Sequence, residues 1–213
     1  MHYSLCDMFS DLTQNSIEAG ASVVTVRLIQ DEASVRFSVE DNGKGMSLAT
    51  LQKASDPFYT DGVKHPGRKV GLGIPFLIQT AEETGGSWKI SSRAAGAGTA
   101  ELSSGGAFAA DTHPESGEGT GTFLACAFDL TNIDLPPLGD VPGFFRQCLA
   151  FPQKYEMVVE RKAPWTEYTL KRSELLDALG LDGPEDFSEV SVLHLMGTYL
   201  ESLESEEGEK KNG

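Results

Sequence analysis

The stretch SVEDNGKGMS, residues 38–47, joins a strand to a glycine-rich loop with no spacer. The residues before it alternate apolar and polar side chains, which is typical of a strand with one buried face. Asp41 stands at the strand end, above the core, where its carboxylate can accept a hydrogen bond from an exocyclic amine. Gly43 and Gly45 lack side chains, so a flat ring can approach the backbone there. The stretch therefore predicts a ligand site at this edge of a sheet.

Upstream of the loop, residues 3–19 are predicted to form an amphipathic helix that stops at Gly20. Its apolar side chains recur at three- and four-residue spacing: Leu5, Met8, Phe9, Leu12 and Ala19. A first strand follows by alternation, and the polar residues 30–34 predict a hairpin turn to the strand that ends at Asp41.

The same helix carries a polar trio, Asp11, Asn15 and Glu18. At about 100° per residue these side chains fall within ~60° of one another, beside the apolar stripe. The carboxamide oxygen of Asn15 is a hard ligand suited to Mg²⁺, which takes few protein ligands. Asp11, one turn away, is placed to hold or deprotonate a water. For Glu18 we expect a structural or surface role.

Downstream of the loop, Ser47 is expected to cap a short helix. Residues 56–71 lack periodicity and predict a long loop, of the kind that often forms a lid. GLG, residues 71–73, opens a further helix, whose free amides and positive dipole end suit a phosphate. Arg68 and Lys69 add positive charge beside it.

The connection 94–121 is rich in Gly, Ala and Ser, so we expect a mostly flexible insertion in a hairpin. The stretch NIDLPPLGD then marks a boundary near residue 132, because it combines turn residues with two prolines.

Beyond that boundary, residues 133–205 are predicted to form a small α+β appendage. We expect it to contain three helices, at 141–151, 173–180 and 188–204. Two strands, at 154–161 and 166–171, are expected between the first and the second helix. Ser173 and Ser188 are the expected N-caps. Residues 206–213 are acidic and predict a disordered tail.

The chain has 213 residues and a net charge of −15. Such a surface repels nucleic acid and anionic membranes, so neither is an expected partner. The three cysteines, Cys6, Cys126 and Cys148, are odd in number and form no CxxC spacing, which indicates a reducing cytosol. No apolar run approaches the roughly 20 residues that a membrane span needs.

The ordered set QNSIEAGA, DNGKGM, DPFYT, VGLGIPFL and GTGTF resembles the ATP-binding fold shared by DNA gyrase, the ninety-kilodalton heat-shock chaperones, histidine kinases and MutL-type proteins, together called GHKL. The resemblance covers about residues 3–130. It implies an α+β, two-layer α/β sandwich with a mixed, mostly antiparallel sheet and helices on one face. It also implies an ATP-binding domain at 1–132, with ATP and Mg²⁺ as ligands.

By this resemblance Asn15 matches the Mg²⁺-ligating Asn and Asp41 the adenine-reading Asp. The matching motifs place further residues around the nucleotide: Gly43, Gly45, Met46, Arg68, Lys69, Gly71, Leu72, Gly73 and Thr122. In hydrolysing members a Glu four residues before the Asn acts as the general base. This chain has Asp11 there, one methylene shorter, so hydrolysis stays an open alternative.

Three functions follow from these features. The first is an ATP-binding regulatory protein without a phosphoacceptor domain, in which the nucleotide orders the lid and controls a protein partner. The second is a protein kinase acting in trans, of the anti-sigma or histidine kinase type, and the third is a non-hydrolysing nucleotide sensor. Self-phosphorylation is not expected, because no histidine lies in a helix of the phosphoacceptor type: His2, His65, His113 and His194. We expect His194 to be a core residue.

A narrower resemblance rests on MHYSL at the start and NIDLPPLGD after the last strand of the ATP-binding part. Both are similar to stand-alone ATP-binding proteins of anaerobic bacteria, which are often encoded beside iron-hydrogenase subunits. This resemblance implies a hydrogenase-related protein as the partner.

Overall fold

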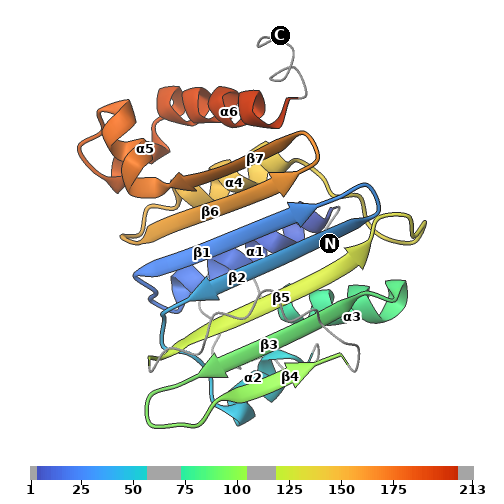
Figure 1. Ribbon diagram of the computed structural model, residues 1–213. Helices are drawn as coiled ribbons and strands as arrows, with labels where there is room; N and C mark the ends of the chain where they lie inside the picture. The colour runs from blue at the N-terminus through green and yellow to red at the C-terminus, as the bar shows by residue number, and fades with distance from the viewer. Residues whose placement is uncertain (1–3, 57–72, 105–118, 206–213) are drawn as a thin grey trace.

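The computed structural model describes residues 4–56, 73–104 and 119–205. In these residues one seven-stranded sheet has the order β4-β3-β5-β2-β1-β6-β7 (Figure 1). The strands are β1 Val23–Gln30, β2 Ser34–Asp41, β3 Ser87–Arg93, β4 Ala100–Ser103, β5 Gly121–Asp129, β6 Glu156–Ala163 and β7 Thr166–Lys171. Of the described neighbours, β1 and β6 run parallel and all other pairs run antiparallel.

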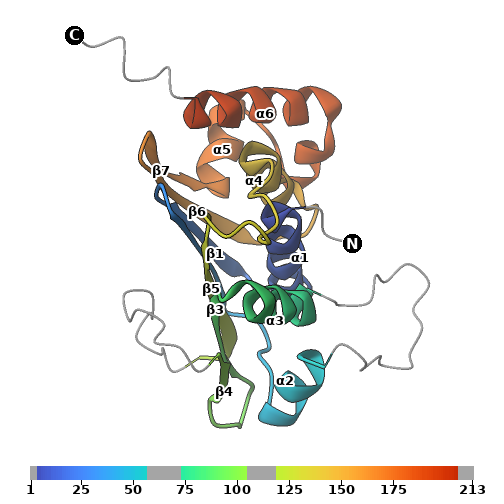
Figure 2. The same cartoon turned by 90° about the vertical axis from the view of Figure 1, so that its right-hand side faces the viewer.

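The helices lie on one face of this sheet (Figure 2). They are α1 Leu5–Glu18, α2 Leu48–Ala54, α3 Gly73–Thr84, α4 Val141–Ala150, α5 Arg172–Leu179, the 3-10 helix η2 Pro184–Ser188 and α6 Val190–Glu204. The predicted fold class is therefore confirmed: a two-layer α+β fold with a mixed, mostly antiparallel sheet.

Helix α1 packs on β1 and β2 and also contacts α3 and α4. It begins with a capping box, in which the Asp7 N–H donates to Ser4 Oγ at 3.2 Å and the Ser4 N–H donates to Asp7 Oδ2 at 3.0 Å. Its apolar face packs on the sheet, where the rings of Phe9 and Phe37 stack with centroids 4.2 Å apart. Phe144 of α4 meets both rings edge-on, so α1, β2 and α4 share one core.

The segment after residue 132 extends the same sheet rather than building a second one. Strand β6 runs beside β1, with Val26 opposite Val159, and β7 pairs with β6. The buried side chains of both halves form one contiguous hydrophobic cluster. The boundary near residue 132 does not divide the sheet. Whether it separates two folding units stays a prediction.

The structure corrects several local expectations. Within the connection 94–121, residues 100–103 form β4 on the edge of β3. Ser173 is the second residue of α5 and Ser188 the last of η2, so neither caps a helix. His194 is exposed rather than in the core, because α6 turns this side to solvent. Most of the predicted lid and the tail 206–213 lie outside the described residues.

Candidate functional site

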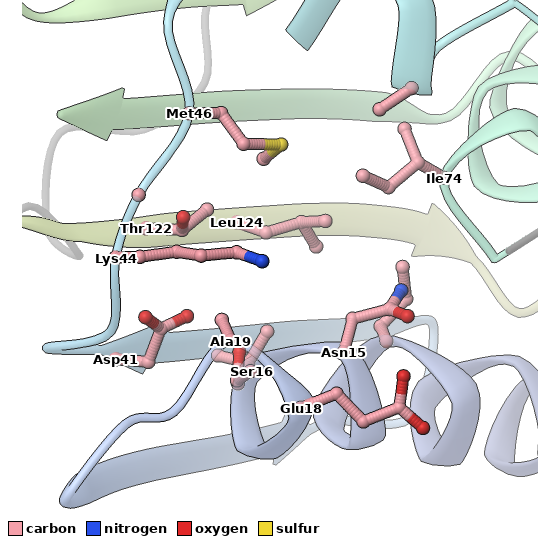
Figure 3. A pocket seen from close by; sticks show the side chains of 14 residues that line it. Asn15, Ser16, Glu18, Ala19, Asp41, Lys44, Met46, Ile74, Thr122 and Leu124 are labelled. Carbon is pink, nitrogen blue, oxygen red and sulfur yellow. The ribbon is translucent and has the colours of Figure 1, made fainter. Parts of the chain in front are cut away.

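A cavity of about 250 Å³ lies between the C-terminal half of α1 and the sheet (Figure 3). Its apolar walls come from α1, β2, the following loop, α2, α3 and β5: Leu12, Val39, Met46, Ala54, Ile74 and Leu124. Its polar side chains are Asn15, Ser16, Glu18, Asp41, Lys44 and Thr122. Segments far apart in the sequence thus form an apolar slot with a few polar groups, which is typical of a small-molecule site.

Asp41 is the buried charge of this cavity. It ends β2 and is only 7 % exposed. Burial raises the pKa of its carboxyl group, and hydrogen bonds from the Ser16 side chain and from the backbone at Gly43 and Thr122 partly oppose that rise. The Gly43 N–H donates to Asp41 Oδ1 at 2.8 Å. The carboxylate is therefore held in one orientation, with acceptor capacity directed at the slot.

Gly43 and Gly45, the two glycines after Asp41, exclude a side chain for different structural reasons. A Cβ at Gly43 would lie 2.9 Å from Asp41 Oδ1, so the glycine lets its own amide reach that carboxylate. Gly45 has φ of 62°, and a Cβ there would overlap the carbonyl oxygen of Arg93 at the end of β3. Gly45 lines the cavity. The sequence predicted that this glycine makes room for a ring, but the close approach of the Arg93 backbone is enough to explain why no side chain fits here.

Hydroxyl groups connect this loop to β5. Ser92 Oγ donates to the Gly121 carbonyl at 3.1 Å and accepts from the Met46 N–H at 2.8 Å. The Thr122 hydroxyl, 2.8 Å from Ser92 Oγ, is then the donor in that pair. Because Thr122 lies directly opposite Asp41 in the β2–β5 register, both residues offer acceptor oxygens at the same end of the cavity.

The other end of the cavity is formed by α1 and the start of α3. A Cβ built at Gly73 would lie 3.6 Å from Asn15 Nδ2 and 3.5 Å from the Asp11 Cβ. The first turn of α3 is thus beside the polar trio. Asn15 and Glu18 line the cavity, and Glu18 accepts from Gln14 Nε2 at 2.9 Å.

Several predicted site residues cannot be placed. Arg68, Lys69, Gly71 and Leu72 lie outside the described residues, and their contacts with phosphate stay predictions. Conversely, Ser16, Lys44 and the apolar wall residues other than Met46 line the cavity without having been predicted as site residues. Lys44 stands between Gly43 and Gly45, and Ser16 follows Asn15, but neither residue type is unusual at its position, so the sequence carries no signal of its own for either.

A family model described as "Histidine kinase-, DNA gyrase B-, and HSP90-like ATPase" matches residues 3–131. The chain belongs to this family. Of the helices in the described part of this ATPase-family chain, none is long and apolar enough to cross a membrane.

Individual relatives match this chain over different shares of its length. The sensor kinase CckA of Brucella abortus is 34% identical over 74 residues, which is 35% of this chain but only 8% of the kinase. Among solved structures, the ATPase domain of Aquifex aeolicus MutL in complex with ADP has a TM-score of 0.42 at 17% identity, over 85% of this chain and 70% of that one. The ATP-binding domain of Francisella tularensis topoisomerase IV, in complex with an inhibitor, has a TM-score of 0.44 at 16% identity, over 78% and 84%.

The residues around the cavity fit the nucleotide that an ATPase family implies. An amino group with two N–H donors would satisfy Asp41 and Thr122, and its flat ring would lie between apolar walls. The described residues hold no cluster of three or more His, Cys, Asp or Glu side chains that could bind a metal by themselves. Mg²⁺ that keeps its waters and nucleotide oxygens needs few protein ligands, which the Asn15 carboxamide fits.

Proposed function

We propose that this chain binds Mg-ATP in the cavity and acts as an ATP-dependent regulator of a protein partner. The observation that carries the proposal is the buried Asp41 carboxylate at one end of an apolar slot. A carboxylate kept out of water with a raised pKa is characteristic of a functional site. Membership in an ATPase family supports ATP as the ligand.

The polarity of the cavity supports one direction of binding. The base would lie at the Asp41 and Thr122 end, and the phosphates would extend toward Asn15 and the first turn of α3. Backbone amides at a helix start suit an anion, and the predicted GLG motif and Arg68 and Lys69 belong to the same stretch of chain. Mg²⁺ held at Asn15 would neutralise phosphate charge.

The regulatory part of the proposal concerns the residues between α2 and α3. Nucleotide contacts there would favour one arrangement of the predicted lid, and a partner that binds this arrangement better would respond to ATP. The narrower sequence resemblance supports a hydrogenase-related partner.

Phosphotransfer to a partner is a second candidate function. The identity with a sensor kinase over 74 residues supports it. Transfer and hydrolysis both need a placed acid, and Asp11, whose Cβ lies close to the Gly73 position, is the candidate for either.

Labelled γ-phosphate separates these functions. Regulation with slow hydrolysis predicts release of inorganic phosphate, which is lost in Asp11→Asn. Transfer of label to a co-purified protein would instead support the kinase, and the absence of both reactions would leave a sensor. Glu82→Gln, an acid on α3 that does not line the cavity, makes the same charge change as a control.

Thermal unfolding tests binding itself. At a concentration of 100 times Kd, Mg-ATP should stabilise the fold by about 2.7 kcal/mol, which raises Tm by roughly 5–10 °C in a chain of this size. No change in Tm, or the same rise in Asp41→Asn, would refute the nucleotide site.

A further inference from the structure

Lys44 is held at the mouth of the cavity by its backbone. Its N–H donates to the Ala19 carbonyl at 3.1 Å, so the residue is fixed between the end of α1 and the loop that follows Asp41. From there the side chain runs along the cavity toward Asn15, with its ammonium group between the Asp41 end and the Asn15 end (Figure 3).

Within the described part of the chain, the ammonium group of Lys44 has no acidic partner. Of the described residues that line the cavity, Lys44 is the one cation, beside the acids Asp41 and Glu18. Within residues 4–56, 73–104 and 119–205 no carboxylate forms an ion pair with it, whereas Arg27, Lys89 and Lys171 all have acidic partners. In a chain with net charge −15, an unpaired ammonium group directed into a cavity points to an anionic ligand.

We propose that Lys44 contacts the phosphates of the bound nucleotide and makes the site selective for nucleotides over nucleosides. This inference rests on the proposed function. If the base lies against Asp41 and the metal at Asn15, the part of the ligand between them is the sugar and its phosphates. The ammonium group of Lys44 lies over that part, where a nucleoside offers no charge.

Binding measured by calorimetry with adenosine, ADP and ATP tests the proposal. Lys44→Met keeps the length of the side chain and removes its charge. We expect it to weaken ADP and ATP binding by about threefold to tenfold, the range for a single charged contact that remains partly solvated. Adenosine binding should be unchanged, and Lys44→Arg should keep most of the affinity for ADP.

Salt provides a second readout. Because a contact with phosphate is screened by ions, ADP affinity of the wild type should fall more steeply with added salt than that of Lys44→Met. Lys154→Met, an exposed residue between α4 and β6, makes the same change in net charge away from the cavity and should behave like the wild type.

The outcomes separate this inference from the proposed function. A wild type that binds ADP, with a Lys44→Met variant that binds it equally well, overturns the role of Lys44 alone. An equal loss for adenosine and ADP also overturns it, since the lysine would then support the base or the fold. A wild type that binds no nucleotide overturns both proposals. Because Lys44 is exposed, its variants should keep the Tm of the wild type.

Discussion

We expect the buried Asp41 carboxylate to destabilise the fold without ligand, and the proposed function requires it for nucleotide binding. Its pKa is raised by burial above the ordinary value of 3.8, so the folded state holds this proton more tightly than the unfolded state. As pH rises from 3.8 through the raised pKa, the folded carboxyl must ionise at a cost, and stability is lost across that window. Asp41→Asn removes this loss while keeping an oxygen that can accept from Gly43.

The variant should therefore gain unfolding free energy relative to the wild type as pH rises through that window, with a constant difference above it. Its affinity for ADP should fall by about tenfold to a hundredfold, because a charged acceptor is lost. In the wild type, ADP affinity should fall on acidification at a pH above 3.8. Denaturant titrations and calorimetry across pH measure these effects, and a variant less stable than the wild type at pH 7 would contradict them.

Gly45 and Gly20 allow a matched comparison of two glycines with positive φ. Gly20→Ala introduces only backbone strain, because nothing lies within 4 Å of the new Cβ, and should cost about 1 kcal/mol. Gly45→Ala adds the overlap with the Arg93 carbonyl and should cost about 3 kcal/mol or more. Equal losses in unfolding free energy would show that the loop moves away from β3 without resistance.

Cavity residues could be predicted from the sequence only where the residue type is informative in its sequence context. Asp41 could be predicted to lie at this cavity because of its context, since Asp-Asn-Gly alone is a common turn, whereas here it ends a buried strand and belongs to an ordered set of motifs. Lys44 and Ser16 could not, because a lysine in a loop and a serine in a helix are ordinary until folding brings them to the cavity. Gly45 requires a glycine for a reason that the sequence did not predict, because the carbonyl of Arg93 that excludes a Cβ is 48 residues away in the chain.

At the scale of elements, Arg172 holds the connection between α4 and β6 in place. Its guanidinium, 1 % exposed, donates to the carbonyls of four residues at 2.6–3.0 Å: Leu149, Phe151, Gln153 and Tyr155. The guanidinium also lies 4.1 Å from the Tyr155 ring centroid. Arg172→Met leaves these oxygens without donors and should cost about 3–5 kcal/mol.

The neighbouring Lys171 supplies the control. It pairs with Glu174 at 3.0 Å, but both side chains are more than half exposed, so Lys171→Met should cost less than about 1 kcal/mol. Urea denaturation of both variants measures the contrast. Similar losses would mean that the carbonyls find water in place of Arg172.

The elements themselves were predictable where their pattern is long. Strands β1 and β2 alternate apolar and polar side chains over most of their length, at Val24–Leu28 and Ser34–Glu40, and α1 shows a continuous apolar stripe. Strand β4 has only four residues and exists because the edge of β3 offers backbone partners, so no local pattern marks it. The prediction of Ser173 as an N-cap was wrong, also because of a contact that is distant in the sequence. Helix α5 begins at Arg172, whose side chain is held by the carbonyls of the α4–β6 connection.

At the scale of the whole molecule, the sequence suggested two units and the structure shows one sheet. A proline-rich segment at 133–139 resembles a linker locally, but parallel pairing between β1 and β6 joins residues more than 130 positions apart. Such pairing leaves no periodic signal. The same contact predicts that the two halves unfold together, since separating them would expose the edge of β1 and the face of α1 that contacts Phe144.

The two tryptophans of the chain report on the two halves separately. Trp88 is buried on β3, and Trp165 joins β6 to β7 with the Arg161 guanidinium 5.9 Å from its ring centroid. Trp165→Phe and Trp88→Phe each leave one reporter. In either variant, the fluorescence transition in urea should coincide with the far-ultraviolet circular dichroism transition, as expected for one cooperative unit. Comparing two signals within one variant cancels any effect of the substitution on stability. A Trp165 signal that changes at lower urea than the dichroism would instead show that residues 133–205 unfold independently, and the boundary near residue 132 would then be a real division of the fold.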